Sequence, residues 1–150
     1  MRRIVTLVLF IALVFGGGTL IGVSNMPGEW YAGLTKPPFN PPNWIFGPVW
    51  SLLYVMIAVA GWRTWERRPA GAAMQVWFAQ LAANFAWSPT FFGMQSPGLA
   101  LVVVLVMLAL VLLFIHLVRH RDSVSAWLFA PYAAWVAFAS LLNASIVVLN

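Results

Sequence analysis

Long runs of apolar residues, separated by short polar segments, dominate the chain. The runs cover residues 4–24, 44–62, 72–92, 99–115 and 124–149. Because an α-helix rises about 1.5 Å per residue, each run is long enough to cross a hydrocarbon core of roughly 30 Å. The pattern therefore predicts an all-α membrane protein: a bundle of five transmembrane helices in a single domain spanning residues 1–150.

Two other interpretations of the apolar runs are less consistent with the sequence. The strands of a transmembrane β-barrel alternate apolar and polar residues, whereas residues 99–115 are apolar at every position. The first run follows Arg2 and Arg3, as in a signal peptide, but no cleavage site of the Ala-x-Ala type precedes Pro27. We therefore expect this segment to remain in the protein as its first helix.

The composition and the distribution of charge agree with a membrane protein. Hydrophobic residues make up 63% of the chain and charged residues 7%, whereas soluble domains have about 25% charged residues. The net charge is +5, but the arginines lie at the ends of the apolar runs, so we expect no nucleic-acid partner. With five crossings, Lys36 is the one basic residue on the side opposite the N-terminus. The side of the N-terminus collects Arg2, Arg3, Arg63, Arg67, Arg68, Arg119 and Arg121.

This asymmetry predicts the orientation of the protein. Cytoplasmic segments of membrane proteins carry an excess of lysine and arginine. We therefore expect an N-terminus inside the cell and the proline-rich loop outside, in the cytoplasmic (inner) membrane. An outer membrane is the alternative location.

The few charged and metal-binding residues argue against several classes of function. The acidic residues are Glu29, Glu66 and Asp122; all three fall in predicted loops or at helix ends, so the intramembrane charges that drive ion-coupled transport are missing. His116 and His120 share a helix face, but they lie among arginines at the membrane surface, and we expect no metal site. No Ser-His-Asp set or pair of carboxylates can be assembled, so we predict no classical enzyme.

The third run predicts a helix with two unlike faces. At about 100° per residue, Gln80, Asn84, Trp87 and Phe91 share one face. Amide side chains in a bilayer need partners, so this face should point into the bundle. The opposite face is formed by small residues, which either pack within the bundle or allow close approach of a second copy. We favour a homodimer. The expected dimer face consists of Ala72, Ala79, Ala82, Ala83 and Ala86.

Two other runs carry comparable stripes, which together suggest a binding pocket. Trp50 and Tyr54 share a face of the second run, and Trp135, Ala139 and Leu142 share a face of the fifth. A mostly apolar pocket with a few hydrogen-bonding groups is the usual composition of a small-molecule site. Tryptophans near the predicted helix ends are instead typical of the membrane interface.

The stretch KPPFNPPNWIFGPVW, residues 36–50, holds five of the ten prolines. Proline restricts φ to about −65° and favours an extended, polyproline-like backbone. We therefore expect the loop before the second run to be stiff and to form a lid across the mouth of the bundle. Trp50 would project inward below this lid.

Three segments resemble the signature segments of the TspO/translocator protein family, also called tryptophan-rich sensory proteins (TspO/MBR). They read WYAGLTKPPFNPPNWIFGPVW, QLAANFAWSPTFFG and PYAAWVAFASLLN, and they occur in this order along essentially the whole chain. The resemblance implies a five-helix bundle, commonly dimeric, that binds tetrapyrroles such as protoporphyrin IX. In bacteria it implies a regulatory role in porphyrin or stress responses.

The resemblance also implies roles for individual residues. Its lid corresponds to Trp30, Tyr31, Pro41 and Pro42. Its pocket corresponds to Trp50, Asn84, Trp87, Trp135, Ala139 and Leu142, all of which the helical stripes select as well. Animal members end in a sterol-recognition pattern with a tyrosine and a basic residue, but this chain ends SLLNASIVVLN, so sterol binding is in doubt.

The sequence therefore predicts a membrane receptor or sensor for a tetrapyrrole ligand, with no obligatory cofactor. No histidine lies inside a predicted helix as an axial ligand, so we expect a free-base ring held by shape and stacking, with Lys36 as a partner for its propionates. One alternative is light-dependent porphyrin degradation with Trp50 and Trp135 as redox partners. The other is transport of lipid or porphyrin.

Overall fold

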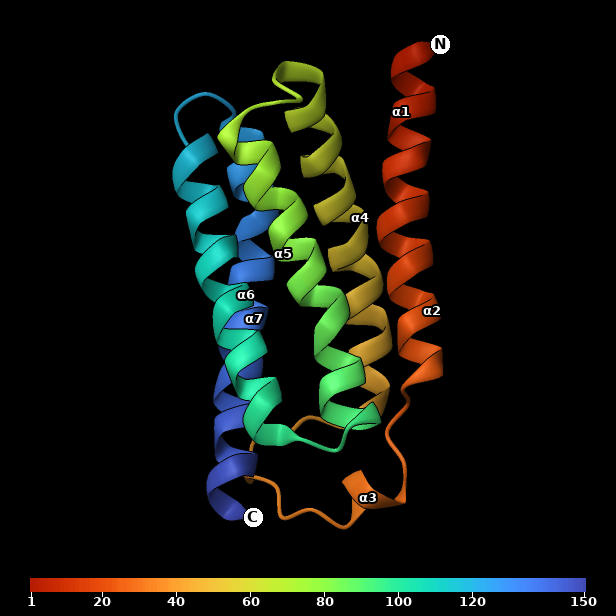
Figure 1. The fold of residues 1–150 in the computed structure, drawn as a ribbon, viewed down its shortest axis with the longest axis vertical. Coiled ribbons are helices and arrows are strands. Elements are labelled where there is room, and N and C mark those ends of the chain that lie inside the picture. Colours follow the sequence, from red (N-terminus) through yellow and green to blue (C-terminus); the bar gives the residue numbers. More distant parts are fainter.

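The computed structural model describes residues 1–150 as helices joined by loops (Figure 1). Two of the helical segments, η1 and η2, are π-helical and continue the helices beside them. In chain order the segments are α1 (Arg2–Ile11), η1 (Ala12–Gly16), α2 (Gly17–Ser24), α3 (Glu29–Ala32), α4 (Asn43–Arg67), α5 (Ala72–Ser88), η2 (Pro89–Gly93), α6 (Pro97–Val118) and α7 (Ser123–Leu149).

Four helical segments are long and apolar enough to cross a membrane: the continuous segment Arg2–Ser24, α4, α6 and α7. The predicted all-helical membrane architecture is confirmed. Helix α5 has 17 residues and passes directly into η2, where Pro89 cannot donate a backbone hydrogen bond and a wider π-turn follows. A fifth crossing at this segment stays a prediction.

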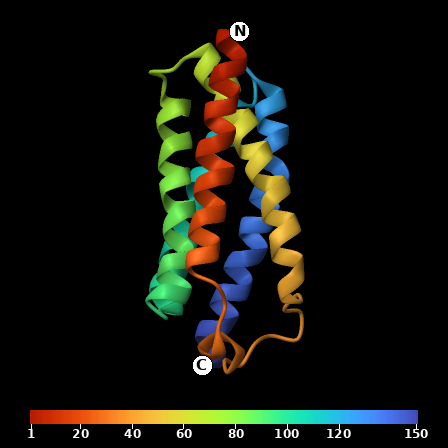
Figure 2. The ribbon, with the colours of Figure 1, turned by 90° about the vertical axis from the view of Figure 1, so that its right-hand side faces the viewer.

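The long helices run along one axis and form a bundle (Figures 1 and 2). Helix α6 packs against α5 and α7, and α4 packs against α7. Helix α1 lies at the edge, where it contacts α4. The N-terminus, the end of α4 and the α6–α7 loop share one end, and the C-terminus and α3 share the other.

A close approach between α4 and α5 anchors the core. The side chain of Trp77 is fully buried, and its indole Nε1 donates to the carbonyl of Ile57 over 3.0 Å. A Cβ atom on Gly61 would lie 2.4 Å from the Trp77 ring, so only glycine leaves room for the indole at this position. The hydrogen bond matters because an unpaired polar group in an apolar core is costly.

The loop between α2 and α4 is anchored at the end of the bundle that holds the C-terminus. Tyr31 in α3 packs edge-on against Phe91 and Phe92, with ring centroids 6.0 and 5.3 Å away. The Asn150 side chain accepts from the Thr35 backbone N–H over 2.9 Å and donates to the Thr35 carbonyl over 2.8 Å. The proline-rich loop therefore follows a defined path across the bundle end.

At the opposite end, Asp122 joins α4 to α7. Its carboxylate caps α7 by accepting from the Ser125 backbone N–H and accepts from Arg63 Nη2 over 2.9 Å and Nε over 3.3 Å. Burial by itself would raise the pKa of Asp122, but the hydrogen bonds from Arg63 and Ser125 outweigh it and hold the pKa below its usual value.

This lowered pKa predicts an acid-sensitive contribution to stability. The ionised Asp122 stabilises the fold above its unfolded-state pKa of about 3.9. The contribution is lost as the pH falls through the lower folded-state value. We expect Asp122→Asn to cost about 1–3 kcal/mol at neutral pH and to flatten the fall in melting temperature below about pH 4, measured on protein in non-ionic detergent. Glu29→Gln, at an exposed residue of α3, is the control. An unchanged acid dependence in Asp122→Asn would contradict the assignment.

Candidate functional site

A cavity of about 550 Å³ lies inside the bundle, near the end that carries α3. Small-molecule pockets have volumes of roughly 300–1,000 Å³. Its walls come from α2, α4, α5, η2, α6 and α7, and the loop after α2 contributes as well. None of the lining residues is charged. The cavity therefore suits a ligand with a large apolar body.

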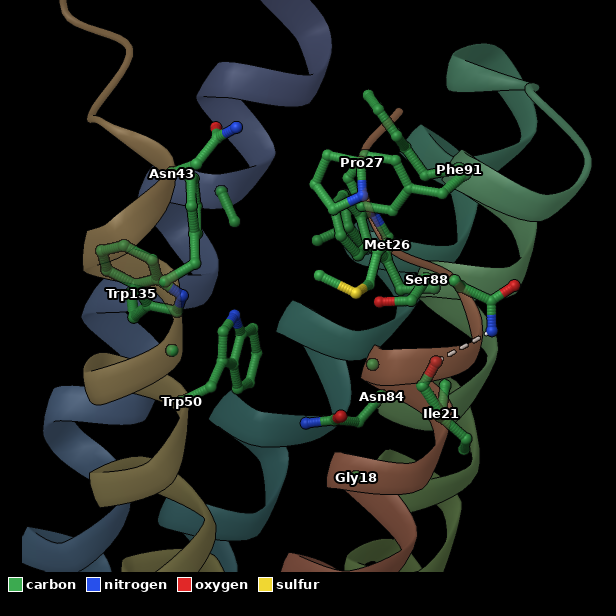
Figure 3. A pocket seen from close by; sticks show the side chains of 18 of the residues that line it. Gly18, Ile21, Met26, Pro27, Asn43, Trp50, Asn84, Ser88, Phe91 and Trp135 are labelled. Carbon is green, nitrogen blue, oxygen red and sulfur yellow. Dashed lines mark hydrogen bonds between the residues drawn. The ribbon is translucent and has the colours of Figure 1, made fainter. Parts of the chain in front are cut away.

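Aromatic rings form two opposing walls of the cavity. Figure 3 shows Trp50 and Trp135 on one side and Phe91 on the other. Trp50 lies 5.5 Å from Tyr54, centroid to centroid, with 32° between the ring planes. Trp87 stacks on Phe91 at 5.0 Å and 27°. Flat rings held in this way favour a flat aromatic ligand, because aromatic faces pair in offset stacks or edge to face.

A buried chain of hydrogen bonds supports Asn84 at the cavity. The Tyr132 hydroxyl donates to Gln80 Oε1 over 2.7 Å and accepts from Asn84 Nδ2 over 2.8 Å. All three residues are buried, and Asn84 also lines the cavity. With its Nδ2 engaged in this way, Asn84 has its carbonyl oxygen left to accept a hydrogen bond from a ligand.

The two cavity tryptophans on α5 and α7 differ in their indole N–H groups. Trp87 Nε1 donates to Asn143 Oδ1 over 3.0 Å, and Asn143 Nδ2 donates to the Pro97 carbonyl over 2.8 Å. The Trp87 ring is thus held in place by the protein itself. Trp135 Nε1 is buried without a partner, an arrangement that costs free energy unless a bound molecule accepts the hydrogen bond. No group of the protein accepts the hydrogen bond that this N–H could donate.

Helix α2 closes the cavity through a close approach to Tyr54. A Cβ atom on Gly18 would lie 2.4 Å from the Tyr54 ring, so a side chain at this position would push the helix away. Gly18, Ile21 and Gly22 all line the cavity, and sequence reasoning missed all three. The signal that was available is the small-residue run GGGTLIG at residues 16–22, since glycines four apart allow close helix contact.

The structure brings most of the predicted pocket residues together. Those that line the cavity are Tyr31, Trp50, Tyr54, Asn84, Trp87, Trp135, Ala139 and Leu142. Three predicted lid residues lie outside the lining: Trp30 packs on the Phe91 ring at 5.7 Å, and Pro41 and Pro42 lead from the loop into α4. The loop contacts the cavity instead through Met26, Pro27 and Asn40, together with Tyr31.

Lys36, the expected partner of an anionic ligand group, points at Tyr31. Its Nζ lies 4.5 Å from the centre of the Tyr31 ring and donates to the carbonyl of Leu34 over 3.3 Å. Lys36 is not among the residues that line the cavity. The cation is therefore held beside the cavity by Tyr31, which itself lines the cavity.

The small-residue face of α5 points away from the bundle. Ala72, Ala79, Ala82 and Ala86 are exposed, whereas Ala83 is partly buried and packs against the core. These four alanines therefore lie on the surface of the bundle. Its role as a dimer contact stays a prediction.

Helices able to cross a membrane, arranged around an uncharged cavity lined by aromatic residues, define an integral membrane protein. The chain belongs to the TspO/MBR family, whose model matches residues 7–149. It is 37% identical to a tryptophan-rich protein TspO of Archaeoglobus fulgidus, over 100% of this chain and 97% of the relative. It is 37% identical to a tryptophan-rich sensory protein of Cereibacter sphaeroides, over 90% and 85% of the two chains. A translocator protein of Ovis aries is 35% identical, over 87% and 82%.

The hydrogen-bonded chain below the cavity can be tested through Tyr132. Tyr132→Phe leaves the amides of Gln80 and Asn84 buried without their shared partner, and we expect a loss of about 1–3 kcal/mol in the free energy of unfolding. Reversible denaturation in detergent micelles measures the loss. Tyr54→Phe is a matched control, because Tyr54 lines the same cavity and its hydroxyl does not belong to this chain of hydrogen bonds. Equal stability of the two variants would contradict the assignment.

Proposed function

We propose that the protein is a membrane receptor with five transmembrane helices, α5 and η2 together forming the third, and that it binds a tetrapyrrole such as protoporphyrin IX in the internal cavity. The observation that carries the proposal is the uncharged cavity of about 550 Å³ with Trp50, Trp87 and Trp135 in its walls. Membership of a family with relatives named as sensory and translocator proteins supports a role in sensing or reception.

A tetrapyrrole ring matches the walls of the cavity in shape and polarity. Its macrocycle is flat, aromatic and apolar, so it can stack against Trp50 or lie edge-on to Trp135. Each aromatic pair contributes about 0.5–1.5 kcal/mol beyond simple burial. Because no charged side chain lines the cavity, the ring would enter without displacing an ion pair.

The polar groups of the cavity suit a metal-free ring. A free-base tetrapyrrole carries pyrrole N–H donors and ring-nitrogen acceptors. Asn84 Oδ1 can accept from a donor, and Trp135 Nε1 can donate to an acceptor. The anionic propionates would remain at the loop end, where Lys36 is the one cation of the segment 25–42.

Through the loop between α2 and α4, binding of a ligand in the cavity could change the surface of the protein. Tyr31 lines the cavity and also carries the Lys36 ammonium on its ring face. A ligand that displaces the Tyr31 ring would shift α3 and the Lys36 side chain together. We infer that a regulatory response to porphyrin would begin with this displacement.

The pocket assignment can be tested by removing Trp50 and Trp135, the two tryptophan rings on one side of the cavity. We expect Trp50→Ala with Trp135→Ala to weaken protoporphyrin binding by about fivefold or more, because two aromatic contacts are worth about 1–3 kcal/mol beyond burial. The shift of the porphyrin absorbance band on titration with purified protein measures the affinity.

The matched control is Trp127→Ala. Trp127 lies on α7 as Trp135 does, is 76% exposed and does not line the cavity, so its removal should leave the affinity unchanged. Wild-type affinity in the double variant, or equal losses in the control, would place the ligand elsewhere, for example in the detergent micelle.

We also propose that two copies of the chain associate through the exposed alanine face of α5. Ala79, Ala82 and Ala86 leave a shallow surface that a second helix can approach closely. The protein has no cysteine, so Ala82→Cys introduces a unique thiol inside the membrane segment. Oxidation in membranes by a lipid-soluble catalyst should give a disulfide-linked dimer.

Leu112→Cys is the control for this experiment, because Leu112 is exposed on α6 and lies outside the alanine face. The thiol at this position should remain monomeric under the same conditions. Equal cross-linking at the two positions would indicate random collision and would contradict the proposed dimer face.

A further inference from the structure

A second, smaller pocket lies at the end of the bundle opposite the large cavity, between the start of α1 and the end of α4. Its volume is about 150 Å³, and its five lining residues are Arg3, Trp62, Arg63, Glu66 and Arg67. Figures 1 and 2 place the N-terminus at the same end as the last turns of α4. Four of the five residues are charged, so this arginine pocket suits an ionic group and not the apolar body of a ligand of the large cavity.

We propose that the arginine pocket binds the phosphate group of an anionic phospholipid. Arg63 donates hydrogen bonds from Nε and Nη2 to the carboxylate of Asp122. Arg67 donates one from Nη1 to the carbonyl of Arg121. The other terminal nitrogens, Nη1 of Arg63 and Nη2 of Arg67, form no such contact. Planar guanidinium groups with unpaired N–H donors match the oxygens of a phosphate.

Arg3 completes the pocket from α1 and is held near it by Trp62. The indole Nε1 of Trp62 donates to the Arg3 carbonyl over 3.0 Å, and the Arg3 guanidinium lies 5.9 Å from the Trp62 ring centre. Its ion pair with Glu66 is long, at 3.8 Å, and the Arg3 side chain is 73% exposed. Such a weak, exposed pair leaves Arg3 able to turn toward an arriving anion.

The charge balance of this end favours an anion despite the two carboxylates nearby. Glu66 and Asp122 offset two of the three pocket arginines. The whole end holds seven arginines against these two carboxylates, which leaves an excess of five positive charges. Basic pockets between transmembrane helices attract anionic lipid head groups for this reason.

The position of the pocket argues for a lipid and against a free phosphate ion. Its residues lie at the ends of Arg2–Ser24 and α4, two segments long and apolar enough to cross a membrane. Basic residues at the ends of membrane-spanning helices lie at the level of the lipid head groups. A lipid phosphate is therefore present at this depth of the membrane, whereas a free phosphate ion would have to arrive from solution.

A bound phosphate would also connect two elements of the bundle. In its first turns α1 packs against α4, and Trp62 to Arg3 is the one hydrogen bond that joins this part of α1 to α4. A phosphate held by Arg3 of α1 and Arg67 of α4 would add a link to this hydrogen bond and to the long Arg3–Glu66 ion pair. The proposal does not depend on what the large cavity binds.

Native mass spectrometry of the protein in non-ionic detergent can test the pocket. We expect dioctanoyl phosphatidylglycerol to be retained in preference to dioctanoyl phosphatidylcholine. Arg3→Gln and Arg67→Gln should each weaken retention about fivefold, the factor corresponding to about 1 kcal/mol for one basic residue near an anionic lipid. Arg119→Gln, at an exposed arginine of the same end outside the pocket, should leave retention unchanged.

Three results would overturn the proposal. Equal retention of the two lipids would show that the phosphate charge is not recognised, and an equal loss in Arg119→Gln would show a diffuse surface effect. Competition by inorganic phosphate at concentrations similar to those of the lipid would assign the pocket to free phosphate. Because Arg67 also contacts the α6–α7 loop, Arg3→Gln decides the outcome if Arg67→Gln does not fold.

Discussion

Inside a bilayer, a polar group that finds no partner within the protein finds none at all, and this constraint organises the whole bundle. The backbone meets it by being helical throughout the apolar segments. The side chains meet it through hydrogen bonds between helices. Gln80 and Asn84 of α5 share the hydroxyl of Tyr132 on α7, and Trp87 of α5 reaches Asn143 of α7. These contacts position α5 relative to α7, and the cavity lies between them.

The same constraint bears on the proposed ligand of the cavity. Trp135 Nε1 is buried without a partner, whereas Asn84 Nδ2 and Trp87 Nε1 are both paired. A molecule that stacks on the aromatic rings and accepts this hydrogen bond would remove the penalty. The membership of the chain in the TspO/MBR family is consistent with such a site, and the proposed tetrapyrrole has the required flat, apolar shape.

The two ends of the bundle differ in charge. One end holds an uncharged cavity under a proline-rich loop, and the other holds seven arginines, Asp122 and Glu66. Charge inside the cavity would raise the cost of burying an apolar ligand, whereas charge at the arginine end lies where head groups and water can solvate it. The proposed ligand site and the proposed lipid site can therefore be altered separately by mutation.

Most of the correct predictions about the bundle came from the helical periodicity of the sequence. The sequence alone determined which residues lie in long apolar helices, that Gln80 and Asn84 face inward, and that Ala82 and Ala86 face outward, because 100° per residue sets these directions within one helix. Only the tertiary structure decided that Gly18 lines the cavity, that Tyr31 and not Trp30 reaches it, and that Lys36 turns onto Tyr31. Those outcomes depend on the path of a loop and on the distance between helices. Neither is set by the periodicity of a single segment; both follow from how closely α2, α3 and α4 pack together.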